Sequence, residues 1–221
     1  MSASRPSSDV HICNLALDYL NQNPITSIDT PTTKAEETCA RWYHTSRAST
    51  LRKHPWNFAI KRAEISEAVI DIPFGYSSAY ALPSDFIRLL TIGDDVLGTI
   101  TNEFDDLLIR YIFDITDVSK FDALFVEILA LELSIKIGNK FTASEARVEE
   151  LRDMLKKLAP QGYSVDGQER PPTRKQVSKW ASARRNRSRS GVGSKYVTFD
   201  NGVVSPVPFQ LEGGYVLISV L

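Results

Sequence analysis

The chain has 221 residues, of which 43% are hydrophobic and 24% charged, the composition of an ordinary globular protein with a sizeable core. Its net charge of −1 hides an asymmetry, because residues 1–169 carry 17 Lys and Arg against 25 Asp and Glu, whereas residues 170–221 carry 9 against 2. The first residues lack a signal-peptide core, and no stretch approaches the ~18 apolar residues of a membrane span. We therefore expect a protein without a membrane partner or a standard export signal, built as an acidic body with a basic tail.

Two helices are predicted at the start of the chain. Ser8 can cap a helix over residues 9–22, and the capping-box spacing of Thr33 and Glu36 predicts a second helix over residues 33–53. Because the loop between them is short, we expect the two helices to be roughly antiparallel, with their apolar faces together. The two cysteines, Cys13 and Cys39, fall on these apolar faces and are interpreted as small buried side chains in a reducing compartment rather than as a disulfide.

The second helix is predicted to end in a structural corner. Pro55 lacks a backbone N–H and pushes the preceding residue toward extended geometry, so a helix cannot pass it easily. Trp56 and Phe58 follow at once, and aromatic side chains of this size can anchor a core. We expect them to hold the end of the helix against its neighbours.

A small antiparallel β insert is predicted over residues 76–115. Short aromatic and aliphatic runs at 75–83 and 85–92 are bounded by Gly or Pro, as strands often are. Residues 107–115 alternate so that one side is wholly apolar, which predicts a half-buried strand. Residues 97–104 are expected to form a hairpin with it through Asp105 and Asp106, although this turn lacks a glycine.

Helices are predicted to return over residues 118–137 and 143–158. Asp117 can cap the first, a strongly apolar helix that Gly138 is placed to end. The second begins with a Thr142 to Glu145 capping box, and Pro160 and Gly162 are expected to stop it. The predicted fold class is α+β, mainly an α-helical bundle with an inserted small antiparallel sheet and an extended C-terminal arm, the body covering residues 1–162.

The remainder of the chain is predicted to be a tail in two parts. Residues 166–195 have few apolar side chains and an arginine-rich run, so we expect a flexible basic linker over residues 163–195. Residues 196–221 turn apolar and strand-like, and we expect this arm to dock either on its own body or on another chain by strand addition. The basic run has three interpretations: phosphate binding, a solvated tether, or contact with an acidic protein surface.

The residues that could carry catalysis form no recognised site. The three histidines have no metal-ligand spacing, and no nucleotide-binding or nucleophile-elbow motif occurs, so we expect neither a metal nor a cofactor. Carboxylate pairs such as Glu64 with Glu67 could in principle serve a glycosidase, but the paired aspartates at 94–95 and 105–106 suit turn tips better. The sequence favours a protein that is not an enzyme.

Six stretches, in order, resemble the tail tubular protein A, or head-to-tail adaptor, family of short-tailed bacteriophages. They span about residues 9–158 and are Cys13–Leu17, Pro24–Asp29, His54–Ala59, Tyr80–Leu90, Ile109–Tyr111 and Phe121–Glu127. The resemblance implies a structural virion protein at the head–tail junction, made in the host bacterial cytoplasm. It implies a dodecameric ring of this chain that binds the portal protein, extends the channel for double-stranded DNA and supports the nozzle protein, tail tubular protein B.

In that family the segment after the last helix reaches the portal, which makes the tail the expected interface with the portal or a neighbouring subunit. The expected contacts are Arg174, Lys175, Lys179, Trp180, Arg184, Arg185, Arg187, Arg189, Tyr196, Phe199, Val207, Phe209 and Tyr215. Two alternatives stay open: a nucleic-acid-binding or DNA-packaging factor that uses residues 170–195, and a peptidoglycan hydrolase. One adaptor of the family is credited with that hydrolysis, but no residue here carries the activity over.

Overall fold

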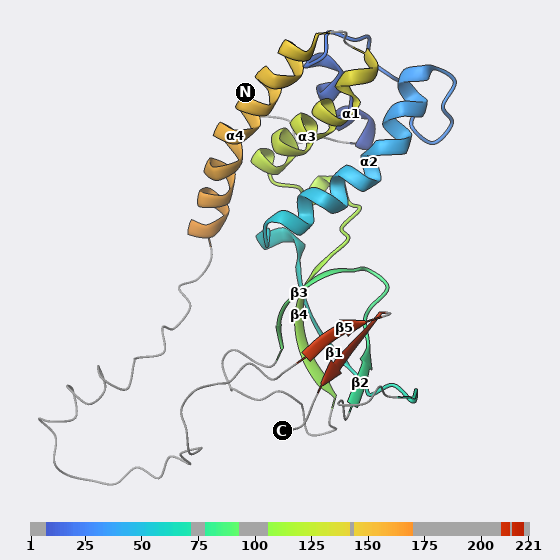
Figure 1. Cartoon of the computed structure of the whole chain (residues 1–221), viewed down its shortest axis with the longest axis vertical. Helices are drawn as coiled ribbons and strands as arrows, with labels where there is room; N and C mark the ends of the chain where they lie inside the picture. The colour runs from blue at the N-terminus through green and yellow to red at the C-terminus, as the bar shows by residue number, and fades with distance from the viewer. Residues whose placement is uncertain are drawn as a thin grey trace, which may run out of the picture.

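The computed structural model describes residues 8–71, 78–92, 106–141, 144–169, 209–212 and 214–218, without the side chains of 209–212 and 216–218. This part of the chain has the α+β fold that the sequence predicts. Four α-helices form one half of the described structure, and two antiparallel sheets form the other (Figure 1). The chain leaves the helical half after α2 and returns to it before α3.

The first two helices are α1 (Asp9–Asp18) and α2 (Lys34–Lys53). Ser8 caps α1 and the Thr33–Glu36 capping box starts α2, as predicted. The prediction for the end of α1 is wrong by four residues, because Asn21 takes a positive φ of 53° and tight turn bonds replace the helical ones. The helices meet through Cys13 and Cys39, which are free in this structure, and the expectation that both cysteines are buried is confirmed.

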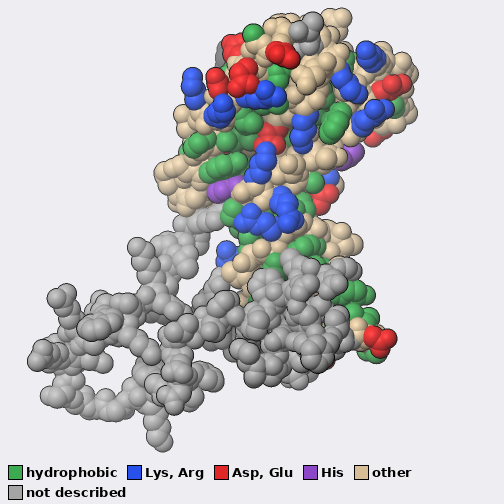
Figure 2. All heavy atoms as spheres, in the orientation of Figure 1, with side chains coloured by type: hydrophobic (Ala, Val, Ile, Leu, Met, Phe, Trp, Pro, Cys, Tyr) green, Lys and Arg blue, Asp and Glu red, His purple; other side chains and the backbone are tan. Residues whose placement is uncertain are grey.

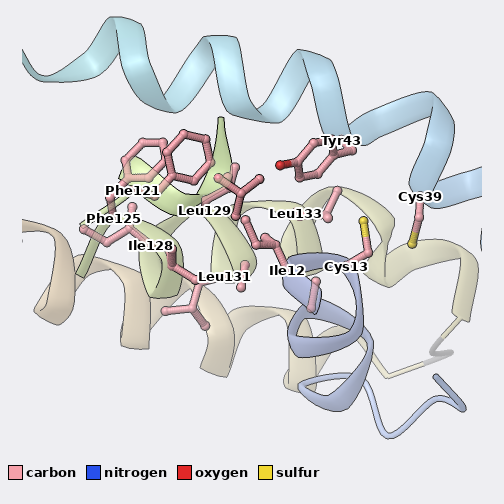
Figure 3. Packing of buried hydrophobic residues seen from close by; sticks show 14 of the residues in the cluster. Ile12, Cys13, Cys39, Tyr43, Phe121, Phe125, Ile128, Leu129, Leu131 and Leu133 are labelled. Atoms are coloured by element: carbon pink, nitrogen blue, oxygen red, sulfur yellow. The ribbon is translucent and has the colours of Figure 1, made fainter. Parts of the chain in front are cut away.

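The central helix is α3 (Ala123–Phe141), against which α1, α2 and α4 all pack (Figure 3). Its buried residues include Phe125, Ile128, Leu129 and Leu133, each 0% exposed. The predicted helix start at Val118 is wrong, because Asp117 caps only a short 3-10 turn (Val118–Lys120). The side chain of Asp122 instead accepts the backbone N–H of Leu124 at 2.8 Å. Gly138 lies inside α3 and does not end it.

The last helix, α4 (Glu145–Gln168), ends ten residues later than predicted. Ser144, rather than Thr142, is its N-cap. Pro160 and Gly162 both lie inside the helix, so the prediction that they stop it is wrong, and residues 163–168 of the predicted linker are helical. A Cβ on Gly162 would come within 2.9 Å of Ile128 Cδ1, which shows that the glycine permits the close approach of α4 to α3.

The first sheet has the order β1-β4-β3, with β1 (Ile60–Ile65) and β3 (Phe86–Ile92) both antiparallel to β4 (Leu107–Phe113). The prediction of a half-buried strand at β4 is confirmed, whereas β1 was not predicted, because its lysine, arginine and glutamate hide the pattern. The predicted hairpin of residues 97–104 with β4 is wrong, since β1 and β3 occupy both edges of β4. Residues 97–104 themselves lie outside the described part.

The second sheet has the order β2-β6-β5 and combines β2 (Ser78–Ala81) with a hairpin at the end of the chain. That hairpin consists of β5 (Phe209–Glu212) and β6 (Tyr215–Ile218), with Gly214 at a φ of 88° in the turn. Tyr80 of β2 joins the first sheet in a small apolar cluster with Ile65, Leu107, Ile109 and Tyr111. This cluster is separate from the main helical core.

Candidate assembly interface

The predicted interface residues fall mostly outside the described part of the chain. Residues 170–208 contain eleven of the thirteen, namely Arg174, Lys175, Lys179, Trp180, Arg184, Arg185, Arg187, Arg189, Tyr196, Phe199 and Val207. The other two are Phe209, the first residue of β5, and Tyr215, the first residue of β6 and partly buried. The described part of the candidate interface is therefore the β5–β6 hairpin and the strand that receives it.

The hairpin pairs with the edge of β2. Strand β6 is antiparallel to β2 in a four-residue register that runs from Ser78 opposite Ile218 to Ala81 opposite Tyr215. The backbone N–H of Leu82 donates to the carbonyl oxygen of Gly214 at 2.8 Å and extends this pairing. Of the two docking modes that the sequence left open, the structure shows the hairpin on its own body.

The other edge of β2 contacts the chain that follows β1. Ala68 donates its backbone N–H to the carbonyl oxygen of Ala79 at 2.7 Å, and Glu67 forms an isolated bridge with Tyr80. This contact is too short to count as a strand. The other two strands of the second sheet, β5 and β6, therefore both come from the hairpin. Strand β2 is thus an acceptor site that is incomplete without β6.

The corner after α2 is built as predicted. His54, the C-cap of α2, has extended backbone geometry before Pro55, and Trp56 is 0% exposed. The ring of Trp56 lies 5.2 Å from that of Phe125 in α3, and the ring of Phe58 lies 5.0 Å from the same ring. These edge-to-face contacts fix the exit of α2 on α3.

A polar cluster that sequence reasoning missed joins this corner to α4. Asp166, 6% exposed, accepts the backbone N–H of Asn57 at 2.8 Å and pairs with Nε2 of His54 at 2.9 Å. The ring of His54 stacks on Tyr163 at 4.5 Å. Burial raises the pKa of Tyr163, and the nearby carboxylate of Glu132 raises it further. The prediction missed the cluster because it placed Tyr163 and Asp166 in a linker.

A buried carboxylate, Glu132 of α3, lies near the same corner. It is 4% exposed and pairs with Nζ of Lys53 at 2.7 Å. Burial lowers the pKa of Lys136, one turn further along α3. Because Glu132 and Asp166 are buried under neighbouring side chains, this arrangement suits bracing of the three helices better than attack on a bulky substrate.

A basic surface lies where the helices meet the sheets. Figure 2 shows Lys and Arg side chains gathered on this face at the junction. Arg52 donates to the carbonyl oxygen of Ile87, and Arg88 donates to the carbonyl oxygen of Arg52 at 2.7 Å. Arg62 of β1 and Arg110 of β4 stand at opposed positions in the first sheet. The basic character of the chain is therefore not confined to its tail.

The stretches that carry the sequence resemblance contact one another in space. Asn14 of the first stretch accepts the backbone N–H of Ile25 in the second at 2.8 Å and donates to its carbonyl oxygen at 3.1 Å. Asp85 of the fourth accepts the hydroxyl of Tyr111 in the fifth at 2.9 Å. The third and sixth meet through the corner aromatics described above. The six stretches thus form three contacting pairs, each between segments that are separate in the sequence.

The described residues contain no group of three or more His, Cys, Asp or Glu side chains that could hold a metal ion. Among the helices in the described ranges, none is long and apolar enough to cross a membrane. No protein-family model matches the chain, and no curated protein is significantly similar to it.

Proposed function

We propose that the protein is a structural head-to-tail adaptor of a short-tailed bacteriophage. In this role, copies of the chain form a ring under the portal protein, extend the DNA channel and provide a platform for the nozzle protein. The observation that carries the proposal is that the six stretches resembling the adaptor family contact one another in pairs. Residues that specify one fold should contact each other where its elements meet. Asn14 with Ile25, Trp56 with Phe125, and Asp85 with Tyr111 meet in this way.

The charge distribution supports the same role. Residues 1–169 have eight more acidic than basic side chains, and like charge discourages a DNA duplex from adhering to the wall of a channel. Residues 170–221 have seven more basic than acidic side chains and suit an acidic surface on a portal or a neighbouring subunit. A ring subunit needs a surface that lines the channel and an element that attaches it to its neighbours. In this chain the acidic body would serve as the first and the basic tail as the second.

The experiment that tests the proposal mixes the purified chain with the portal protein of the same virus and images the product by electron microscopy. A closed ring of the chain on the tail side of the portal is the expected result. A complex without a ring, or no complex, overturns the proposal.

A DNA-binding or packaging factor is the second candidate, favoured by the basic surface at the junction around Arg52 and Arg88. Its signature is affinity for duplex DNA that falls steeply with salt concentration. Tight DNA binding by the free chain, together with failure to bind the portal, would favour this candidate over the adaptor.

A further inference from the structure

We propose that in the assembled ring the β5–β6 hairpin of each subunit leaves its own β2 and pairs with β2 of the next copy. This inference rests on the proposed function, because the ring places copies of the chain side by side. It assigns the partner of the β2 edge as a second copy of the same chain.

The hairpin is attached to the body by strand pairing along β2, from Ser78 to Ala81, and by the bond from Leu82 to Gly214. Backbone pairing of this kind has the same geometry whether the two strands belong to one chain or to two. Exchange therefore loses no contact at β2 and changes only which body receives the hairpin.

The chain between α4 and the hairpin is long enough to extend to a neighbouring subunit. The end of α4 and the hairpin lie well apart, on different halves of the molecule (Figure 1). They are connected by the 39 residues 170–208, which can span at most about 140 Å. A compact chain of this size is about 40 Å across. The hairpin can therefore reach β2 of an adjacent subunit as well as its own.

The hairpin also covers an edge of β2. Unpaired strand edges lead to aggregation, and β2 would present such an edge if the hairpin were absent. Pairing within one chain covers the edge while the subunit is free. In a ring the neighbouring β2 is present at high effective concentration, and each subunit gives one hairpin and receives one. Strand β6 thereby covers the β2 edge of the free monomer and connects neighbouring subunits in the ring.

The test uses cysteines at Ala81 and Tyr215, which are opposed positions in β2 and β6. Two single variants, Ala81→Cys and Tyr215→Cys, are mixed, assembled on the portal, oxidised and run on a non-reducing gel. The native Cys13 and Cys39 are buried and common to all samples. Exchange predicts a covalent dimer in the mixture and a ladder of covalent oligomers from the double variant.

The control pairs Ala81→Cys with Glu212→Cys. Glu212 lies opposite Tyr215 on β5, one strand further from β2, so its Cα is about 10 Å from that of residue 81. That separation is too long for a disulfide, and the control mixture should stay monomeric on the gel.

A mixture that gives no covalent dimer, with a double variant that closes only within one chain, overturns the exchange. Electron microscopy of the same samples shows independently whether rings have formed. Rings without cross-links leave the adaptor proposal standing and reject the exchange, whereas cross-links without rings support the exchange and reject the adaptor.

Discussion

Asp166, in the last turn of α4, accepts the backbone N–H of Asn57 at 2.8 Å, and its own carbonyl oxygen accepts the side-chain amide of Asn57 at 2.7 Å. These bonds connect positions 109 residues apart in the sequence. They fix the end of α4 on the corner after α2, directly before the tail begins at residue 170. The departure point of the tail is therefore held by the body.

Replacing Asp166 should destabilise the protein strongly. Asp166→Ala removes the acceptor of the partly buried N–H of Asn57 and the partner of His54, at a cost of about 2–3 kcal/mol in the free energy of unfolding. Urea unfolding measures this. Asp153→Ala, on an exposed face of the same helix, is the matched control and should leave the midpoint unchanged. Equal midpoints for the two variants would show that the cluster does not brace the fold.

Two glycines of α4 should respond in opposite directions to alanine. At Gly162 a Cβ would meet Ile128 at 2.9 Å and Trp56 at 3.5 Å, so Gly162→Ala should lower the free energy of unfolding by about 1–2 kcal/mol. At Gly167 a Cβ meets nothing within 4 Å, so Gly167→Ala should raise it by about 0.5–1 kcal/mol. Thermal or urea unfolding of both variants decides this, and stabilisation by both would refute the close approach of α4 to α3.

The ion pair of Arg47 with Asp114 should be important for joining α2 to the end of β4. Arg47 donates from Nε and Nη2 to this carboxylate at 3.0–3.1 Å and is 3% exposed. Loss of one member of a buried pair costs about 3–5 kcal/mol, and because water can reach Asp114, we expect about 3 kcal/mol for Arg47→Met. Arg152→Met, which breaks an exposed pair with Glu149, should cost less than about 1 kcal/mol. Comparable losses for the two variants would contradict this assignment.

The loop before α2 should give the protein a dependence on acid pH. Hydrogen bonds to Glu36 from Thr32, Thr33 and Thr26 hold the pKa of this carboxylate well below its ordinary value of 4.5. A depressed pKa stabilises the fold above the unfolded-state pKa, and this contribution is lost as pH falls through the folded-state pKa. At neutral pH the free energy of unfolding should therefore be higher for the wild type than for Glu36→Gln. This difference between the two proteins should become smaller below about pH 4.5.

The measurement is urea unfolding of both proteins at several values between about pH 7 and pH 3. Glu37→Gln is the control, because it removes the same charge from the same helical turn at an exposed position. A gap between wild type and Glu36→Gln that stays constant over this range would contradict the assignment.

The sequence predicted best those features that depend on local chemistry. The capping box at Thr33 and the block at Pro55 set the ends of α2, because caps and proline act through their immediate neighbours. The alternation in β4 was also sufficient to identify a half-buried strand. Each of these features can be recognised in the sequence without knowing which other helices or strands pack on that helix or strand.

The sequence failed where tertiary contacts override local preference. Pro160 and Gly162 are usual helix stops, yet α4 continues because its face packs on α3 and the glycine fits under Ile128. The bracing cluster at Asp166 was missed for the same reason. At the candidate interface the sequence indicated a strand that needs an edge, but the identity of that edge, β2, depends on a contact more than 130 residues away in the chain.

The most direct test of the adaptor account compares the full chain with a variant that ends at Glu169, each mixed with the portal protein and analysed by electron microscopy and native mass measurement. The truncated chain removes the basic segment and the hairpin but keeps all four helices and the first sheet. The account predicts a closed ring on the portal for the full chain, and for the truncated chain a folded subunit that does not join the portal. Rings of the truncated chain on the portal would show that the tail is not the attachment element and would contradict the account.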